Sequence, residues 1–300
     1  MITFSKLGEK GNLGNQLFQI ASTIGIATRN NQSYCFPSWK YSIYFENEFD
    51  VLNKNVDFES ILEKQYCYSD IILEYKNFDL SGWFQTEKYF NVEKIKSIFQ
   101  FNKEFLDNLV QNNINLFNKK NILISVRRGD FVNHPFYFQT NYQFYFLAIK
   151  NNFPDWKDRT LIFASDDISY CKFHFSFLKN AVFLENLSAI EQLALGSKCD
   201  DFVISNSTFS WWLAWLGERN KTKIIRPIKN FRGTFALENN DKDFFPERWV
   251  PFDESKFHLD NEYIVLKIKG FFYQLTVDFK FYFFVYFKLV KNFIKKIIRW

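Results

Sequence analysis

The second half of the chain alternates short apolar runs with helical patterns, and this alternation limits the fold more than any other feature. Five runs have the composition of buried strands, namely NILISV, TLIFAS, AVFLEN, DFVIS and KIIRP, all between residues 121 and 227. The segments between them, such as NYQFYFLAIKNNF and TFSWWLAWLGERN, have apolar side chains at helical spacing. Buried strands that alternate with helices predict an α/β fold, with a parallel sheet covered by helices on both faces.

The N-terminus predicts the start of a second α/β unit. A short strand within residues 1–6 is followed by the loop GEKGNLGN, by the helical pattern QLFQIASTIGIATRNN, and by a strand in SYCF. The middle of the chain is less regular, although DIILEY and LSGWFQ favour extended structure. We therefore expect two Rossmann-like domains facing a cleft, residues 1–120 and 121–258, followed by a basic tail, residues 259–300.

Charge is concentrated at the C-terminus. Segment 263–300 holds eight basic residues and one acidic residue, a net charge of +7, while the rest of the chain carries −2. The body therefore lacks the basic composition of a nucleic-acid-binding surface, and we expect no nucleic-acid partner. The four cysteines show no metal-binding spacing, and the N-terminus lacks the apolar stretch of a signal peptide, so a cytoplasmic protein with reduced thiols is expected.

The tail has the pattern of an amphipathic helix. Lys288, Lys291, Lys295 and Arg299 fall on one helical face, opposite Phe and Ile side chains. The uncharged runs are too short to span a bilayer. We expect segment 263–300 to bind the inner face of the cytoplasmic membrane as a peripheral anchor, and a helix packed on the protein's own body is the alternative.

The stretch SVRRGD follows the predicted strand NILISV and carries Ser125, Arg127, Arg128 and Asp130. Ligands of such folds bind outside the carboxyl ends of the strands. A guanidinium group matches the geometry of phosphate oxygens, so this position favours a phosphate site. The alternative is that the arginines pair only with Asp130 and another carboxylate.

Three further stretches follow predicted strands. The loop before the Trp-rich helix contains Ser205, Asn206, Ser207, Thr208 and Phe209. Free N–H groups and the positive end of the helix dipole favour an anion site there. The alternative is that these residues only cap the helix. The stretch GNLGNQ could place amides on a sugar, or form only a tight turn; it contains Gly14, Asn15 and Gln16. Asp166 and Asp167 could bind a guanine edge or a ribose, or cap a helix. No further oxygen ligands for a metal are evident.

Six stretches, in this order, resemble the bacterial α-1,2-fucosyltransferases of glycosyltransferase family 11: GNLGNQLFQIA, GWFQTEKYF, ISVRRGDFV, FASDD, SNSTFSWWLAWL and PERWV. The resemblance spans about residues 11–250. It implies a GT-B-like fold, with an acceptor-side domain at 1–120 and a donor domain at 121–258. It also implies GDP-fucose as donor, a terminal galactose on a glycan as acceptor, inversion at the anomeric carbon, and no metal or other cofactor. A membrane-bound tail would suit a lipid-linked acceptor such as an O-antigen precursor.

The resemblance also assigns roles to site residues. Arg127 is expected at the donor diphosphate, Asp130 near the acceptor as candidate base, and Asn15 at the donor sugar, and these three are the catalytic candidates. From the four stretches and the resemblance together we expect donor binding by Gly14, Gln16, Ser125, Arg128, Asp166, Asp167, Ser205, Asn206, Ser207, Thr208 and Phe209. Ser125 stands where the family has histidine. This serine motivates one alternative, a membrane-tethered nucleotide-sugar- or glycan-binding protein without turnover. A transferase that uses another GDP-sugar is a separate alternative.

Overall fold

The computed structural model describes residues 1–52 and 56–298. The chain divides into two compact units, one from Met1 to Asp253 and one from Glu254 onward. Both sheets belong to the first unit, and the second sheet begins at Asn121. The domain boundaries at residues 120 and 258 stay a prediction.

The N-terminal sheet has four parallel strands in the order β2-β1-β4-β3. They are β1 (Ile2–Thr3), β2 (Tyr34–Cys35), β3 (Glu59–Leu62) and β4 (Phe78–Ser81). Helix α1 (Leu13–Arg29) connects β1 to β2 and is buried over most of its length. DIILEY forms no strand, and the segment after the sheet contains α2 (Val92–Ile98) and α3 (Lys103–Asn112).

The second sheet has six strands in the order β10-β9-β8-β5-β6-β7, and every pair is parallel, as the alternating pattern predicts. Its strands are β5 (Asn121–Val126), β6 (Thr160–Ser165), β7 (Ala181–Phe183), β8 (Asp201–Ile204), β9 (Ile224–Pro227) and β10 (Val250–Phe252). Its helices are α4 (Tyr142–Asn152), α5 (Ile168–Phe175), α6 (Ala189–Gly196), α7 (Thr208–Gly217) and α8 (Gly233–Glu238). Short 3-10 turns lie at Ser42–Tyr44, Glu87–Tyr89, Ile114–Phe117 and Gly129–Phe131.

Both sheets change direction at their centre. Strand β5 is flanked by β6 on one side and by β8 on the other, and β1 is flanked by β2 and β4. The chain therefore leaves these central strands in opposite directions, which opens a crevice at their carboxyl ends where ligands of such folds bind.

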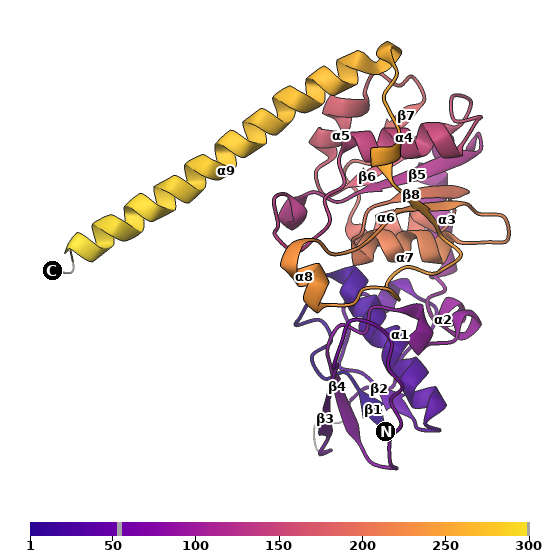
Figure 1. Ribbon diagram of the computed structural model, residues 1–300. Coiled ribbons are helices and arrows are strands. Elements are labelled where there is room, and N and C mark those ends of the chain that lie inside the picture. Colours follow the sequence, from indigo (N-terminus) through magenta and orange to yellow (C-terminus); the bar gives the residue numbers. More distant parts are fainter. Residues whose placement is uncertain (53–55, 299–300) are drawn as a thin grey trace. The chain divides into compact units, whose positions relative to one another are not determined.

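The core between the sheets is aromatic. Trp211, Trp212 and Trp215 of α7 are completely buried, and the rings of Phe18 and Trp211 have their centroids 4.6 Å apart. Figure 1 shows the two sheets at opposite ends of the first unit, with α1 and α7 between them. The tryptophans therefore pack the fold and are not available for stacking on a sugar.

The PERWV stretch ties the two halves together. Arg248 forms ion pairs with Glu87, which follows the first sheet, at 2.5 Å and with Glu218, which follows α7, at 2.7 Å. Trp249 donates a hydrogen bond from Nε1 to Glu218, and Trp215 donates one to Glu87. Packing between the two halves thus explains this motif.

The second unit contains two 3-10 turns, Glu254–Lys256 and Asn261–Tyr263, and the long helix α9 (Ile264–Ile298). No helix within residues 1–52 and 56–298 combines the length and the apolarity needed to cross a bilayer.

Candidate active site

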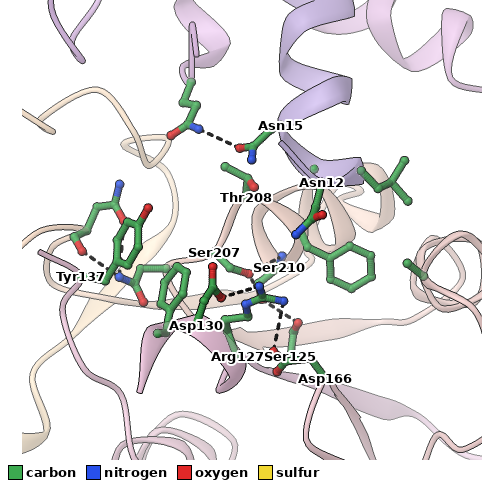
Figure 2. A pocket seen from close by; sticks show the side chains of 18 of the residues that line it. Asn12, Asn15, Ser125, Arg127, Asp130, Tyr137, Asp166, Ser207, Thr208 and Ser210 are labelled. Carbon is green, nitrogen blue, oxygen red and sulfur yellow. Dashed lines mark hydrogen bonds and ion pairs between the residues drawn. The ribbon is translucent and has the colours of Figure 1, made fainter. Parts of the chain in front are cut away.

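A cavity of about 550 Å³ lies in the first unit, where the carboxyl ends of the two sheets meet. Figure 2 shows Asn12 and Asn15 on one side of it and Arg127, Asp130 and Asp166 on the other. Most of the predicted site residues line this cavity, which brings four separate stretches of sequence together: Gly14, Asn15, Gln16, Ser125, Arg127, Asp130, Asp166, Asn206, Ser207, Thr208 and Phe209.

Three predicted donor-binding residues do not line the cavity. Ser205 is fully buried and its hydroxyl lies 2.8 Å from that of Ser210. Asp167 caps α5 by accepting a hydrogen bond from the N–H of Tyr170, which is the alternative that the sequence left open. Arg128 is buried, with its guanidinium 4.2 Å from the centre of the Tyr170 ring.

The N-termini of α1 and α7 meet at the cavity. Gly14 in the first turn of α1 is so close to α7 that an added Cβ would lie 2.4 Å from the backbone nitrogen of Phe209. The first N–H groups of both helices have no partner within their own helix, and each helix adds the positive end of its dipole. Two such ends beside one cavity make a site for an anion.

The amides of the first loop have different roles. Gln16 donates to the carbonyl of Gly11 and accepts from Trp39, so its side chain braces the loop. Asn15 accepts a hydrogen bond from Gln85 at 2.9 Å, and Asn12 is the N-cap of α1 without a capping hydrogen bond from its side chain. Asn15 and Asn12 therefore present amide groups at the cavity wall.

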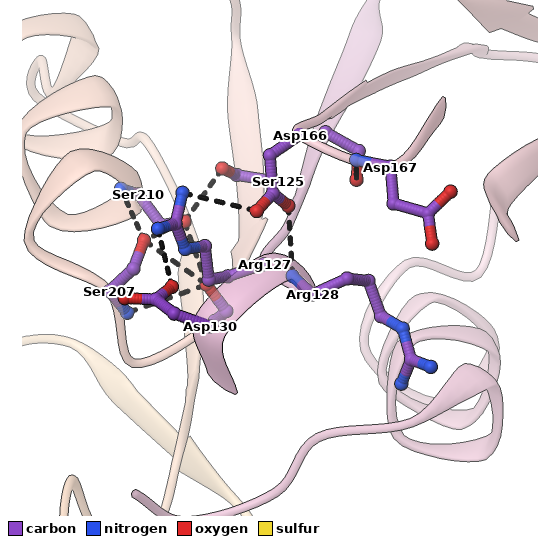
Figure 3. Close-up of polar contacts among 10 residues, drawn as sticks. Ser125, Arg127, Arg128, Asp130, Asp166, Asp167, Ser207 and Ser210 are labelled. Carbon is purple, nitrogen blue, oxygen red and sulfur yellow. Dashed lines mark hydrogen bonds and ion pairs between the residues drawn. The ribbon is translucent and has the colours of Figure 1, made fainter. Parts of the chain in front are cut away.

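Arg127 lies between Asp130 and Asp166, and these three side chains form a polar wall of the cavity (Figure 3). Its guanidinium donates to Asp130 at 2.6 Å and pairs with Asp166 at 3.1 Å, which realises the carboxylate pairing that the sequence left open. Asp166 also accepts the backbone N–H of Arg128, whose side chain extends away from Arg127. The side chain of Asp130 is 63% exposed and that of Asp166 only 25%, so Asp130 is the partner that a ligand can displace.

A cluster of four hydroxyls lies beneath the same wall. Ser210 is within 2.7 to 2.9 Å of the hydroxyls of Ser125, Ser205 and Ser207. Ser125, the position where the resembled family has histidine, is 2% exposed and hydrogen-bonded to Ser210. Its hydroxyl therefore links β5 to the first turn of α7.

Another part of the cavity is an aromatic wall, formed by Tyr66, Phe136, Tyr137, Phe231 and Phe235. Its rings contact each other. Phe136 is stacked on Phe235 with ring centroids 4.5 Å apart, and Tyr66 is edge-on to Phe231 with ring centroids 5.1 Å apart. Burial raises the pKa of the Tyr66 and Tyr137 hydroxyls, so both remain protonated hydrogen-bond donors at neutral pH.

Asn12, the aromatic wall and a group of cavity residues from the first half were not predicted from the sequence; the residues of that group are Lys40, Tyr41, Trp83 and Gln85. Trp83 and Gln85 belong to the stretch GWFQTEKYF, and that motif was the available signal for them. Across the described parts of the chain, no three His, Cys, Asp or Glu side chains gather in a way that could hold a metal ion.

Two parallel α/β halves with an anion site between them have the architecture of the GT-B-like fold. Among solved structures, the chain resembles the apo form of the fucosyltransferase POFUT1 with a TM-score of 0.51 and 12% identity, over 75% of this chain and 97% of that one. It also resembles the fucosyltransferase NodZ from Bradyrhizobium with a TM-score of 0.50 and 11% identity, over 71% and 91% of the two chains. These likenesses confirm the predicted fold class.

The sequence profile of Glycosyl transferase family 11 matches residues 6–251, and the chain belongs to this family. The Escherichia coli alpha-1,2-colitosyltransferase is 25% identical over 80% of this chain and 96% of that protein. A Caenorhabditis elegans protein, svh-11, proposed to be a galactoside 2-alpha-L-fucosyltransferase, is 27% identical over 88% and 81% of the two chains. The Escherichia coli O-antigen biosynthesis glycosyltransferase WbnK is 27% identical, over only about half of either chain.

Proposed function

We propose that this glycosyltransferase moves L-fucose from GDP-fucose to the 2-hydroxyl of a terminal galactose on a glycan, with inversion at the anomeric carbon. The observation that carries the proposal is the meeting of two helix N-termini and Arg127 around one cavity. Membership of family 11 and the names of the relatives support the choice of reaction.

The diphosphate of the donor binds at the first turn of α7. Thr208 and Phe209 of this turn line the cavity, and the first N–H groups of a helix have no partner within the helix itself. Arg127 lies across from them and supplies a fixed positive charge. The carboxylate of Asp166, held by the N–H of Arg128, keeps this guanidinium in place.

Departure of GDP breaks the bond between the sugar's anomeric carbon and the diphosphate oxygen. Negative charge grows on that oxygen, and positive charge spreads over the sugar ring. Donors that are already fixed where the charge develops bind the transition state better than the ground state. In this proposal the leaving oxygen accepts a hydrogen bond from the Nη2 of Arg127. It thereby replaces Asp130, whose ion pair with Arg127 is broken.

The acceptor galactose packs on the aromatic wall. Aromatic side chains with a few polar groups are typical of small-molecule sites, and Tyr66 and Tyr137 add hydroxyl donors to this one. The attacking hydroxyl approaches the anomeric carbon from the face opposite to the diphosphate. The side chain of Asp130 is largely exposed, so once displaced from Arg127 it is free to turn toward that face, where in this proposal it accepts the proton of the hydroxyl.

A second donor has a specific argument in its favour. The relative that matches over 96% of its own length is an alpha-1,2-colitosyltransferase, so a colitosyl donor is the alternative to GDP-fucose. The serine at position 125 also motivates a binding protein without turnover as an alternative.

The experiment is to incubate the full-length chain with GDP-fucose or GDP-colitose and a panel of galactose-terminated oligosaccharides, and to determine the linkage of any product. The proposal predicts an α-1,2-linked fucosyl product that is lost in Arg127→Ala. A product formed only with GDP-colitose would show that the colitosyl donor, and not GDP-fucose, is the substrate. Binding of GDP-fucose by the folded chain without any product would contradict the transferase activity.

A further inference from the structure

Within its own unit, helix α9 (Ile264–Ile298) carries an exposed apolar face. Ile268, Phe272, Leu275, Phe279, Phe283 and Tyr286 recur at spacings of three and four residues, which places them on one side of the helix. All six are between 49% and 73% exposed. Large aromatic side chains that gather in one exposed stripe mark an interaction surface.

The opposite side of the same helix carries lysines beside the exposed rings of Phe281 and Phe284. Lys280, Lys288 and Lys291 are exposed and lie away from the apolar stripe at the helical repeat of 100° per residue. Segment 263–300 carries +7 in total, whereas the remaining residues carry −2. Any long-range attraction to an anionic partner therefore originates in this helix.

We propose that α9 lies in the plane of an anionic lipid bilayer, with its apolar stripe in the acyl boundary and its lysines among the lipid phosphates. A helix of 35 residues at 1.5 Å per residue is about 50 Å long, which favours a long contact parallel to the surface. This inference does not depend on the proposed function. Placement on the inner face of the cytoplasmic membrane stays a prediction.

Charge favours the bilayer over a second copy of the chain. Pairing two α9 helices through their apolar stripes would bring two segments of +7 together, and like charges at short range oppose association. Anionic lipid phosphates reverse the sign of that interaction, because each lysine near such a surface is attracted to it. A lipid surface is thus the occupant that satisfies both sides of the helix.

The bilayer contact has two components with different responses to salt. The attraction between lysines and lipid phosphates is screened by salt, whereas burial of Phe and Ile side chains is not. Binding to anionic vesicles should therefore weaken in high salt but persist.

The test is co-sedimentation of the full-length chain with vesicles of phosphatidylcholine containing phosphatidylglycerol, and with vesicles of phosphatidylcholine alone. Two matched double variants separate the two sides of the helix. Phe279→Glu with Phe283→Glu alters the apolar stripe, and Phe281→Glu with Phe284→Glu makes the same chemical change on the other side of the helix. All four positions are exposed, so neither variant disturbs a packed core.

Both variants lower the net charge by two, and the control places its glutamates beside the lysines, so any weaker binding by the stripe variant reports burial of the stripe. The stripe variant should bind anionic vesicles at least about 100-fold more weakly than its matched control, at low and at high salt. The proposal is overturned if the unaltered chain does not sediment with anionic vesicles, or if the two variants bind equally. It is also overturned if the unaltered chain does not bind vesicles but forms a dimer in solution, as measured by analytical ultracentrifugation, and the stripe variant is a monomer.

Discussion

Replacing Gly14 by alanine tests whether the two helix N-termini must touch. The new Cβ would lie 2.4 Å from the backbone nitrogen of Phe209 and 2.5 Å from the carbonyl carbon of Thr208, whereas ordinary contacts begin near 3.4 Å. The atoms in the way belong to backbone, so the helices themselves must separate, by about 1 Å. Overpacking of this kind costs about 1–3 kcal/mol.

Thermal unfolding and calorimetric binding of GDP-fucose measure the two consequences. Each kcal/mol lowers the Tm of a unit of this size by about 2–4 °C, so Gly14→Ala should lower Tm by roughly 2–12 °C. The separated N–H groups no longer converge on one diphosphate, and we expect donor affinity to fall by about tenfold or more.

The matched control is Gly25→Ala in the same helix. A Cβ there would lie 2.0 Å from the carbonyl oxygen of Tyr89, which is not a cavity residue. This variant should also lose stability but keep the donor affinity of its folded fraction. An unchanged Tm and donor affinity in Gly14→Ala would show that the two helix ends need not touch, and an equal loss of affinity in both variants would show that the contact has no specific role in donor binding.

Three further predictions concern the charges. Arg127→Ala should lower turnover about 10²–10³-fold. Arg127→Lys should restore little of it, since a point charge cannot reproduce the planar guanidinium. Near-normal turnover of folded Arg127→Ala would mean that Arg127 only pairs with its two carboxylates and does not act on the donor. Activity should survive excess EDTA, because protein donors carry the diphosphate charge, and rescue by Mg²⁺ after EDTA inactivation would contradict this. Desolvation raises the pKa of Asp243, but hydrogen bonds from Lys88 and from the N–H of Tyr68 leave it below its ordinary value. Its stabilisation is therefore present at neutral pH and is lost as pH falls through the lowered pKa, so the difference in unfolding free energy between wild type and Lys88→Met should shrink from about pH 7 to about pH 3; a constant difference would refute it.

The parallel sheet of the second half could be predicted because its central strands are buried on both faces and so have continuous apolar runs. Strand β5 is buried at every residue from Asn121 to Val126. The first half gave weaker signals. Strand β3 (Glu59–Leu62) is largely exposed and has no apolar pattern, whereas the apolar stretch DIILEY forms no strand.

The positions of the candidate site could be predicted because parallel strands end at one edge of a sheet. Which of two adjacent residues faces the cavity could not be predicted. Arg127 and Asp166 line it, while Arg128 and Asp167 pack beside α5. The chain turns sharply after each strand. The rule that successive side chains of a strand point to opposite faces of the sheet therefore no longer applies there.

The aromatic wall had no local signal, because it is assembled from three distant segments. Tyr66, Phe136 and Phe231 are ordinary aromatic residues in a chain with 40 phenylalanines, and only the tertiary fold brings them together. The serine cluster has the same origin, since Ser125 and Ser210 belong to different elements that the sheet places side by side.

The most direct test of the central claim is a crystal structure of the full-length chain with GDP. We expect the diphosphate within hydrogen-bond distance of the N–H groups of Thr208 and Phe209 and of the guanidinium of Arg127, with Asp130 displaced from that guanidinium. A diphosphate bound elsewhere, with the ion pairs of Arg127 to Asp130 and Asp166 intact, would contradict it.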